Sequence, residues 1–340
     1  MKVGIIGFGK MGMLHGAIIN SLPGVEIVAI TDTTKLVLKA FSSLLSNVQY
    51  YQSYQEMIDT CPMDAVIITT PSFSHVAIAE YASEHKLDFF TEKPLGVNLE
   101  EAERIYQAVV KNKTKGMVGF AARYYSSFQK GKYAIEANKL GKILSVSAEN
   151  YLSDVMTKGK GWRYDKTISG GGVVIDYSIH MIDLLGWYFG QAKSLTASTK
   201  KIYSESVEDE VQAKIYFLNG TQATLNSSWS NPDYRKSYMK IEIIGEKAQL
   251  VITDQTYTLT QGNIILEKYT YPDLYEGYFI DIGGSNFSLQ MKAFYDHITA
   301  GIPIDSDIKN GLSVQKIVDA IYRSSEKKGE VAIDSGGGND

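Results

Sequence analysis

Residues 3–12 read VGIIGFGKMG, an apolar run followed by three glycines in the spacing G-x-G-x-x-G. The run from Val3 to Gly7 predicts a β-strand, and the following residues predict a helix that stops at Pro23-Gly24. In such a unit the first glycine permits a tight turn, the second lets the backbone approach a pyrophosphate, and the third lets helix and strand pack closely. The helix N-terminus faces the anion. The stretch therefore predicts a dinucleotide site made of Gly7, Phe8, Gly9, Lys10, Met11 and Gly12.

An acidic residue stands where such a site needs one. Asp32 ends the second predicted strand, twenty residues after Gly12. At this spacing a carboxylate meets the adenosine ribose hydroxyls. The carboxylate would repel a 2′-phosphate, so it favours NAD over NADP, although the nearby Lys35 keeps NADP open as the less favoured cofactor.

The first 120 residues alternate apolar strand patterns with helical patterns, which predicts a doubly wound parallel sheet. Ser53 with Glu56 and Asn98 with Glu101 mark helix starts within this series. The expected strands are 3–7, 25–31, 48–51, 65–69, 87–91 and 117–120, and the expected helices are 11–21, 34–45, 53 onward, 74–85 and 98–111. We assign residues 1–121 to a Rossmann domain.

After residue 121 the pattern changes to strand after strand. Strands are expected at 143–151 and repeatedly between 194 and 266, with a hairpin at Asn219-Gly220. Residues 153–169 are polar and predict a loop, and helices are expected at 128–140, from Gly172 to Tyr188, at 287–300 and at 308–325. We assign 122–334 to a substrate-binding and oligomerisation α+β domain with a large, mostly antiparallel open sheet, and 335–340 to a flexible tail. The expected helices suffice for only one face of this sheet, so we expect the other face to be apolar and exposed and to mark an interface between subunits.

Composition narrows the class of protein. The chain has 340 residues, 44% of them hydrophobic and 21% charged, with a formal net charge of −4. These values fit a globular protein and argue against nucleic-acid binding, for which a basic patch is expected. The single cysteine, Cys61, excludes an intrachain disulfide. No apolar run approaches the ~20 residues of a bilayer span, and the glycines near the N-terminus do not fit a signal peptide. A cytoplasmic location is expected.

Three further segments carry side chains suited to chemistry. Glu92-Lys93-Pro94 ends the fifth strand, at the edge where open α/β sheets bind ligands. Trp162-Arg163 and Gly170-Gly171-Gly172 precede Asp176 and His180, which are four residues apart and therefore share one helix face. Glu92 could serve only to hold its loop. We expect no metal, because spacing suggests no third ligand beside Asp176 and His180. For His15, in a helical pattern, a core or surface position is expected rather than a ligand role.

Together these motifs resemble the glucose–fructose oxidoreductase / inositol dehydrogenase family, from Lys2 to about Ala332. The resemblance implies that Lys93 lies near the nicotinamide and the reacting carbon, that its peptide bond to Pro94 is cis, and that Asp176 and His180 belong to the catalytic set. It also places a cofactor-contacting segment at Thr70, Pro71, Ser72 and His75, joined by Glu92, Lys93, Trp162 and Arg163. The resemblance also implies a dimer or tetramer joined through the second domain's sheet.

One segment departs from the family's pattern. Many members have Asn before an Arg-aromatic pair and a proline soon after, whereas this chain reads Ala121-Ala122-Arg123-Tyr124 with no proline until Pro232. The segment borders the substrate pocket, so Arg123 and Tyr124 join Lys93, Arg163, Asp176 and His180 as expected substrate-binding residues.

The sequence thus predicts an NAD(P)-dependent oxidoreductase acting on a secondary alcohol or ketone of a sugar, cyclitol or nucleotide-sugar. His180 is the expected general base, because an imidazole titrates near neutral pH. Lys93 would stabilise the alkoxide or share the proton transfer, and Asp176 would hold the substrate. Two alternatives remain: an NAD-dependent glycosidase of the same fold, and a regulator that binds a dinucleotide without turnover.

Overall fold

The computed structural model describes residues 1–42, 47–270 and 283–334. The chain forms two compact units, each described here by itself. The first consists of Met1–Phe120 and Gly277–Leu312, and the second of Ala121–Glu276 and Ser313–Asp340. The predicted helix end at Leu45 and the predicted tail 335–340 lie outside the described residues.

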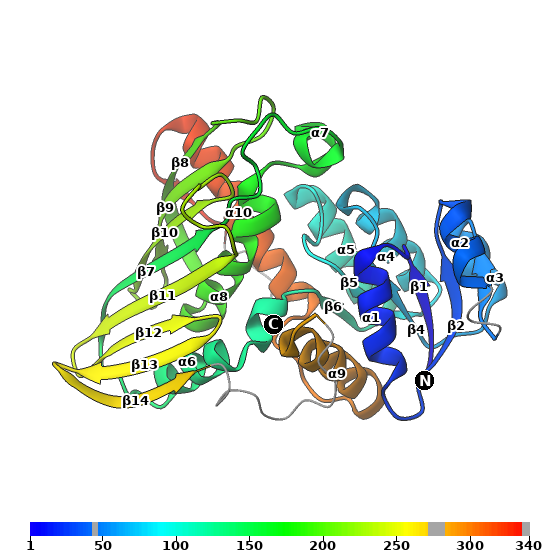
Figure 1. Ribbon diagram of the computed structural model, residues 1–340, viewed down its shortest axis with the longest axis horizontal. Helices are drawn as coiled ribbons and strands as arrows, with labels where there is room; N and C mark the ends of the chain where they lie inside the picture. Colours follow the sequence, from blue (N-terminus) through cyan, green and yellow to red (C-terminus); the bar gives the residue numbers. More distant parts are fainter. Residues whose placement is uncertain (43–46, 271–282, 335–340) are drawn as a thin grey trace. The chain divides into compact units, whose positions relative to one another are not determined.

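A six-stranded parallel sheet forms the centre of the first unit, as the alternating pattern predicted (Figure 1). The strand order is β3-β2-β1-β4-β5-β6, so the direction of winding reverses between β1 and β4. Open α/β sheets bind ligands at this reversal, at the carboxyl ends of the strands. The strands are β1 (Lys2–Ile6), β2 (Glu26–Thr31), β3 (Gln49–Tyr51), β4 (Ala65–Ile68), β5 (Asp88–Thr91) and β6 (Gly116–Val118).

Two predicted helix caps form in this unit. Ser53 Oγ accepts a hydrogen bond from the Glu56 amide at 3.3 Å, and Asn98 Oδ1 accepts one from the Glu101 amide at 2.9 Å. Such caps satisfy amides that the first helical turn leaves unpaired. The helices linking the strands are α1 (Lys10–Asn20), α2 (Lys35–Ser42), α3 (Tyr54–Thr60), the short η1 (Ser72–Ser74), α4 (His75–Glu84) and α5 (Leu99–Asn112).

One predicted boundary differs from the observed division. Helix α9 (Ser285–Ala300), expected in the second domain, packs in the first unit. The ring of Phe287 on α9 meets the ring of His15 on α1, and Lys115 Nζ donates to the carbonyl of His297 at 2.9 Å. Sequence periodicity cannot predict that the chain comes back to the first unit. It indicates which face of a helix is buried, but not which element covers that face.

The second unit contains a nine-stranded sheet in the order β14-β13-β12-β11-β7-β10-β9-β8-β15. Its pairs are antiparallel except β7 with β10, which confirms a large, mostly antiparallel sheet. The Asn219-Gly220 turn joins β9 to β10 as predicted, with Gly220 at φ +86°. The strands are β7 (Ile143–Tyr151), β8 (Ala192–Lys200), β9 (Glu210–Phe217), β10 (Gln222–Ser228), β11 (Tyr238–Gly245), β12 (Gln249–Thr253), β13 (Thr256–Gln261), β14 (Ile264–Thr270) and β15 (Val331–Ala332).

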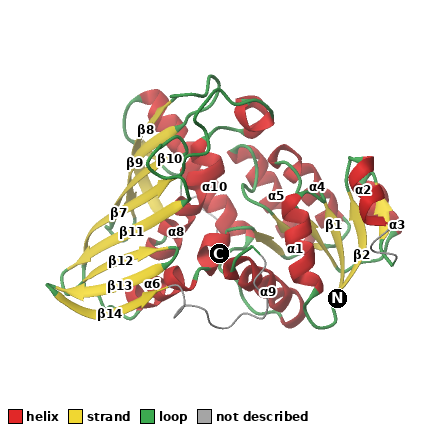
Figure 2. Cartoon of the chain, in the orientation of Figure 1, coloured by secondary structure: helices red, strands yellow, loops and turns green. Residues whose placement is uncertain are grey.

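Helices lie on one side of this sheet (Figures 1 and 2). They include α6 (Ser126–Glu136), α8 (Ile179–Phe189) and the later part of α10 (Ile308–Lys327), preceded by the short η2 (Ala121–Tyr124). The predicted loop 153–169 instead contains two short helices, η3 (Trp162–Tyr164) and α7 (Lys166–Ser169). Asp165 explains the second, since its side chain accepts the Thr167 amide as an N-cap.

The face of the sheet that points away from the helices is polar, so the predicted apolar face was wrong. Alternate residues point outward along each strand, and these include Lys214, Lys240 and Glu242, the last two paired at 2.9 Å. Exposed apolar side chains of this sheet include Leu144, Ile244, Ile264, Ile265 and Leu266, toward strand ends and the edge strand β14.

By length and composition, one helical stretch among the described residues, Lys166–Phe189, could cross a bilayer. However, 72% of its apolar window is buried inside the fold, as in a core helix.

Candidate active site

The glycine turn after β1 shows which of its glycines the protein itself requires. Gly7 has φ +89°, and a Cβ on Gly12 would lie 2.1 Å from the Gly7 carbonyl oxygen. Both positions therefore exclude a side chain. At Gly9, the residue before α1, a Cβ would meet nothing within 4 Å. Protein packing does not explain glycine there, whereas close approach of a pyrophosphate to bare backbone at a helix N-terminus does.

Asp32 lies beside this turn and also stabilises it through hydrogen bonds. Its Oδ2 accepts the amide of Phe8 at 2.8 Å, and its Oδ1 accepts the amide of Thr34 at 2.7 Å. The ring of Phe8 is buried in a core cluster with Ile5, Ile30 and Leu38. Phe8 can therefore offer only its backbone to a ligand, while Lys10 is exposed. The turn and the carboxylate form one rigid group.

A buried histidine links the segment after β4 to the segment after β5. His75 is buried, with Nδ1 2.8 Å from the carbonyl oxygen of Pro94 and Nε2 3.0 Å from that of Thr70. Burial lowers the pKa of His75. Ser74 Oγ donates to Thr70 Oγ1 at 2.7 Å. Of this predicted group, His75 and Ser72 are inside the fold and Pro71 is exposed, so His75 braces the loop and Thr70-Pro71 forms its outer edge.

Glu92 and Lys93 follow β5, and the Lys93–Pro94 peptide is cis as expected. Glu92 Oε1 lies 2.6 Å from Nε2 of His15, and its Oε2 accepts the amide of Lys93 at 3.2 Å. Sequence reasoning left His15 outside the site. The position of His15 one helical turn after Gly12 was the available signal, but its partner is 77 residues away in sequence.

In the second unit, Asp176 and Arg163 form an ion pair. Arg163 Nη2 and Nε lie 2.6 and 3.0 Å from Oδ2 of Asp176, and Nη1 lies 3.3 Å from Asp154. Asp176 sits in a π-helical turn, Val174–Ser178, that precedes α8, where His180 stands. The shared-face argument assumed a regular α-helix, whereas Val174–Ser178 winds as a π-helix directly before the turn that carries His180. Such turns are frequent at functional sites.

Arg123 has a different environment from the one predicted. It is 4% exposed, and its Nε and Nη2 donate to the two oxygens of Asp183 at 2.7 and 2.6 Å. Asp183 lies on α8, one turn after His180. This bidentate pair ties η2 to α8. Tyr124 is half-buried beside it.

Two glycines of the triplet, Gly171 and Gly172, pack against Tyr322 and against Glu208, a buried residue that the sequence analysis missed. Glu208 Oε1 accepts the amides of Gly172 and Val174 at 2.9 and 3.0 Å and the Tyr322 hydroxyl at 3.0 Å. A Cβ on Gly171 would lie 1.9 Å from that hydroxyl, and one on Gly172 would lie 2.1 Å from the Glu208 carbonyl oxygen. Burial raises the pKa of Glu208. Glu208 therefore fixes the start of the segment that carries Asp176.

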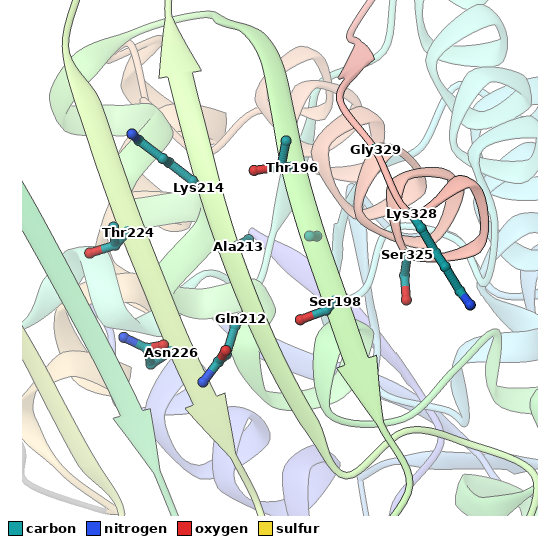
Figure 3. Close-up of a pocket in the computed structure, with 11 residues that line it drawn as sticks. Thr196, Ser198, Gln212, Ala213, Lys214, Thr224, Asn226, Ser325, Lys328 and Gly329 are labelled. Atoms are coloured by element: carbon teal, nitrogen blue, oxygen red, sulfur yellow. The ribbon is translucent and has the colours of Figure 1, made fainter.

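A separate hollow of about 630 Å³ lies on the second unit, over β8, β9, β10 and the end of α10 (Figure 3). Small polar side chains and two lysines line it: Thr196, Ser198, Gln212, Lys214, Thr224, Asn226, Ser325 and Lys328. It contains none of the predicted site residues.

The predicted site residues thus divide between the units. The glycine turn, Asp32, the segment from Thr70 to His75, Glu92 and Lys93 belong to the first, at the carboxyl ends of β1, β2, β4 and β5. Arg123, Tyr124, Trp162, Arg163, Asp176 and His180 belong to the second, around η2, η3 and the start of α8. Within the described residues no three His, Cys, Asp or Glu side chains form a group that could hold a metal.

Comparison with known proteins decides the family. Residues 1–120 match the model described as "Oxidoreductase family, NAD-binding Rossmann fold", and residues 132–333 match its C-terminal alpha/beta domain. The chain belongs to the glucose–fructose oxidoreductase / inositol dehydrogenase family. It is an NAD-binding oxidoreductase of that family, and the bare backbone at Gly9 together with Asp32 fits this cofactor.

Named relatives cover almost the whole chain. Inositol 2-dehydrogenase of Rhizobium meliloti is 23% identical over 346 residues, covering 98% of this chain and 99% of that protein. Levoglucosan dehydrogenase of Pseudarthrobacter phenanthrenivorans is 25% identical over 384 residues, covering 98% of each. A solved levoglucosan dehydrogenase, in complex with NADH and L-sorbose, matches with a TM-score of 0.89 at 22% identity, over 98% of this chain and 99% of that one. This last likeness confirms the two-domain fold.

Proposed function

We propose that this protein is an NAD-dependent dehydrogenase that oxidises a secondary alcohol of a sugar, cyclitol or nucleotide-sugar, or reduces the corresponding ketone. The observation that carries the proposal is the link between the cofactor turn and Lys93. Glu92 contacts His15 on the helix after the glycine turn and also accepts the Lys93 amide. The names of relatives acting on inositol and levoglucosan support a polyhydroxylated ring as substrate.

Each proposed role follows from the chemistry of a side chain. Bound NAD would accept the hydride, and the protein would supply alignment and proton transfer. The Lys93 ammonium would stabilise the alkoxide that forms when the hydroxyl loses its proton. His180 is the proposed general base, with Lys93 as the alternative proton acceptor. Asp176, oriented by Arg163, would accept a hydrogen bond from a substrate hydroxyl.

Other predicted residues have supporting roles in this proposal. The glycine turn, Asp32 and Thr70-Pro71 would contact NAD, and Lys10, Met11 and Ser72 would flank it. Trp162, with 38% of its surface exposed, and Tyr124 could contact substrate or nicotinamide. Arg123 would act by holding α8 through Asp183.

Incubation with NAD and a panel of sugars and cyclitols, followed at the absorbance of reduced nicotinamide, tests the proposal. Accumulation of NADH supports a dehydrogenase. Sugar release without accumulation would indicate an NAD-dependent glycosidase instead, and binding of NAD without either reaction would indicate a regulator.

We also propose that the protein is cytoplasmic and forms a homodimer or homotetramer through the second unit's sheet. Family resemblance supports the assembly, and the polar outward face implies an interface rich in hydrogen bonds rather than an apolar one. A monomeric mass by light scattering at micromolar concentration would contradict it.

A further inference from the structure

We propose that His15 is a positioning residue for Lys93, acting through Glu92. This inference rests on the proposed function, because it concerns how the Lys93 ammonium is held. Glu92 uses one oxygen for His15 Nε2, at 2.6 Å, and the other for the backbone amide of Lys93, at 3.2 Å. The carboxylate thus ties the turn that carries Lys93 to helix α1.

The environment of His15 defines its tautomer. The side chain has no exposed surface, and its ring makes edge contacts with Phe90 at 5.0 Å and Phe287 at 5.8 Å between centroids. Nδ1 is buried and has no hydrogen-bond partner among the described residues. A proton on Nδ1 would be an unsatisfied donor in apolar surroundings, which is costly. His15 therefore carries its proton on Nε2 and donates it to Glu92.

A hydrogen bond in this setting is strong and directional. It is charge-assisted, and its His15 end is fully buried, which strengthens its electrostatics. Helix α9, from a distant part of the chain, contributes to this enclosure through Phe287.

The consequence is a fixed relation between two parts of the site. His15 lies one turn after Gly12, on the helix whose N-terminus faces the cofactor pyrophosphate. Lys93 is held from the same helix through Glu92. Errors of about 1 Å in the placement of a catalytic group can cost ~10²-fold in rate. The pair keeps the ammonium aligned with the nicotinamide rather than contributing to cofactor affinity.

Two substitutions at position 15 test this directly. His15→Leu removes the donor at similar volume, and His15→Gln restores an N–H at a comparable distance from the backbone. With myo-inositol and levoglucosan as probes, His15→Leu should lower kcat by about 10-fold or more, with the Kd of NAD changed less than about 3-fold, and His15→Gln should recover most of the rate. Ile105→Ala is the control for a general loss of stability. Ile105 lies on α5, is fully buried and belongs to no predicted site.

A double variant tests the route through Lys93. In the Lys93→Met background, His15→Leu should cause no further loss of the residual rate, because residues acting as one unit are not additive. Full additivity, or normal kcat in His15→Leu, would overturn the inference. A Lys93→Met protein with normal turnover would instead overturn the proposed role of Lys93 in catalysis and, with it, any effect of His15 on rate through that lysine.

Hydrogen exchange gives a readout that needs no substrate. Loss of the His15 donor should loosen Glu92 and speed exchange at the Lys93 amide with NADH bound, while peptides from β6 stay unchanged. Ile105→Ala should not produce this local effect. Exchange at Lys93 that is unchanged in His15→Leu would overturn the inference even if none of the probes is turned over.

Discussion

Arg163 holds Asp176 through two nitrogens that converge on one oxygen, with Nη2 and Nε at 2.6 and 3.0 Å from Oδ2. Burial alone would lower the pKa of Arg163, but the carboxylates of Asp176 and Asp154 outweigh burial and raise it. The segment 153–169 is thereby fastened to the turn before α8. The carboxylate proposed to hold the substrate is thus oriented by a residue of that segment.

Arg163→Met should therefore weaken catalysis by loosening Asp176. A charge-assisted hydrogen bond is worth about 1.5–3 kcal/mol, so kcat/KM should fall by about 10-fold or more, while the Kd of NAD changes little. Arg163→Lys keeps the charge but not the two-nitrogen geometry, and should recover only part of the loss. Steady-state kinetics and fluorescence titration measure both quantities. A larger effect on NAD binding than on kcat/KM would assign Arg163 to the cofactor instead.

Cofactor choice depends on Asp32. NAD should bind more tightly than NADP, because the carboxylate would repel a 2′-phosphate. Asp32→Asn should narrow this preference while keeping one oxygen to accept a turn amide, and Asp32→Ala should narrow it and also weaken NAD binding, since the Phe8 amide loses its acceptor. Fluorescence titration with both cofactors checks these outcomes. Tighter binding of NADP to the unaltered protein would contradict the assignment.

Lys93→Met should separate rate from cofactor affinity. The ammonium matters chiefly when the alkoxide develops, so turnover should fall by about 10²-fold or more while NAD binding changes little. The measurement is kcat with the best substrate of the panel, beside the Kd of NAD. Near-normal turnover would remove Lys93 from the chemistry and leave His180 as the candidate.

The parts of the site that are local in sequence could be predicted, and those made by distant pairs could not. The spacing of Gly7, Gly12 and Asp32 is encoded within thirty residues and predicted the turn correctly. The partners Arg123 and Asp183 are 60 residues apart, and Glu208 and Tyr322 are 114 apart. Periodicity indicates that such residues are buried, but it does not indicate which distant residue will be the partner of each.

Local rules also failed where tertiary packing overrides them. The helix expected from Gly172 to Tyr188 contains a π-helical turn near its start, where Glu208 accepts hydrogen bonds from the Gly172 amide and the Tyr322 hydroxyl. The outward sheet face was expected to be apolar from the number of helices, whereas the alternation within each strand had already placed polar residues there.

Glu208 should make the stability of the protein depend on pH. Burial raises its pKa in the folded state above the ~4.3 of an unfolded chain. Between these two values the folded state binds more protons than the unfolded state, so the contribution of Glu208 to stability is present at low pH and is lost as the pH rises through the folded pKa.

Glu208→Gln should remove this dependence, because the amide is neutral at every pH and its oxygen can still accept the amides of Gly172 and Val174. The free energy of unfolding of both proteins is measured by urea denaturation at pH 4 and pH 8. Relative to the unaltered protein, the variant should be more stable at pH 8 than it is at pH 4. The matched control is Glu326→Gln, at an exposed position on α10. In this variant the free energy of unfolding should change between pH 4 and pH 8 by as much as in the unaltered protein. If Glu208→Gln instead loses stability relative to the unaltered protein as the pH rises, the carboxylate is stabilised in its charged form. The three donors that meet Glu208 Oε1 would then outweigh its burial.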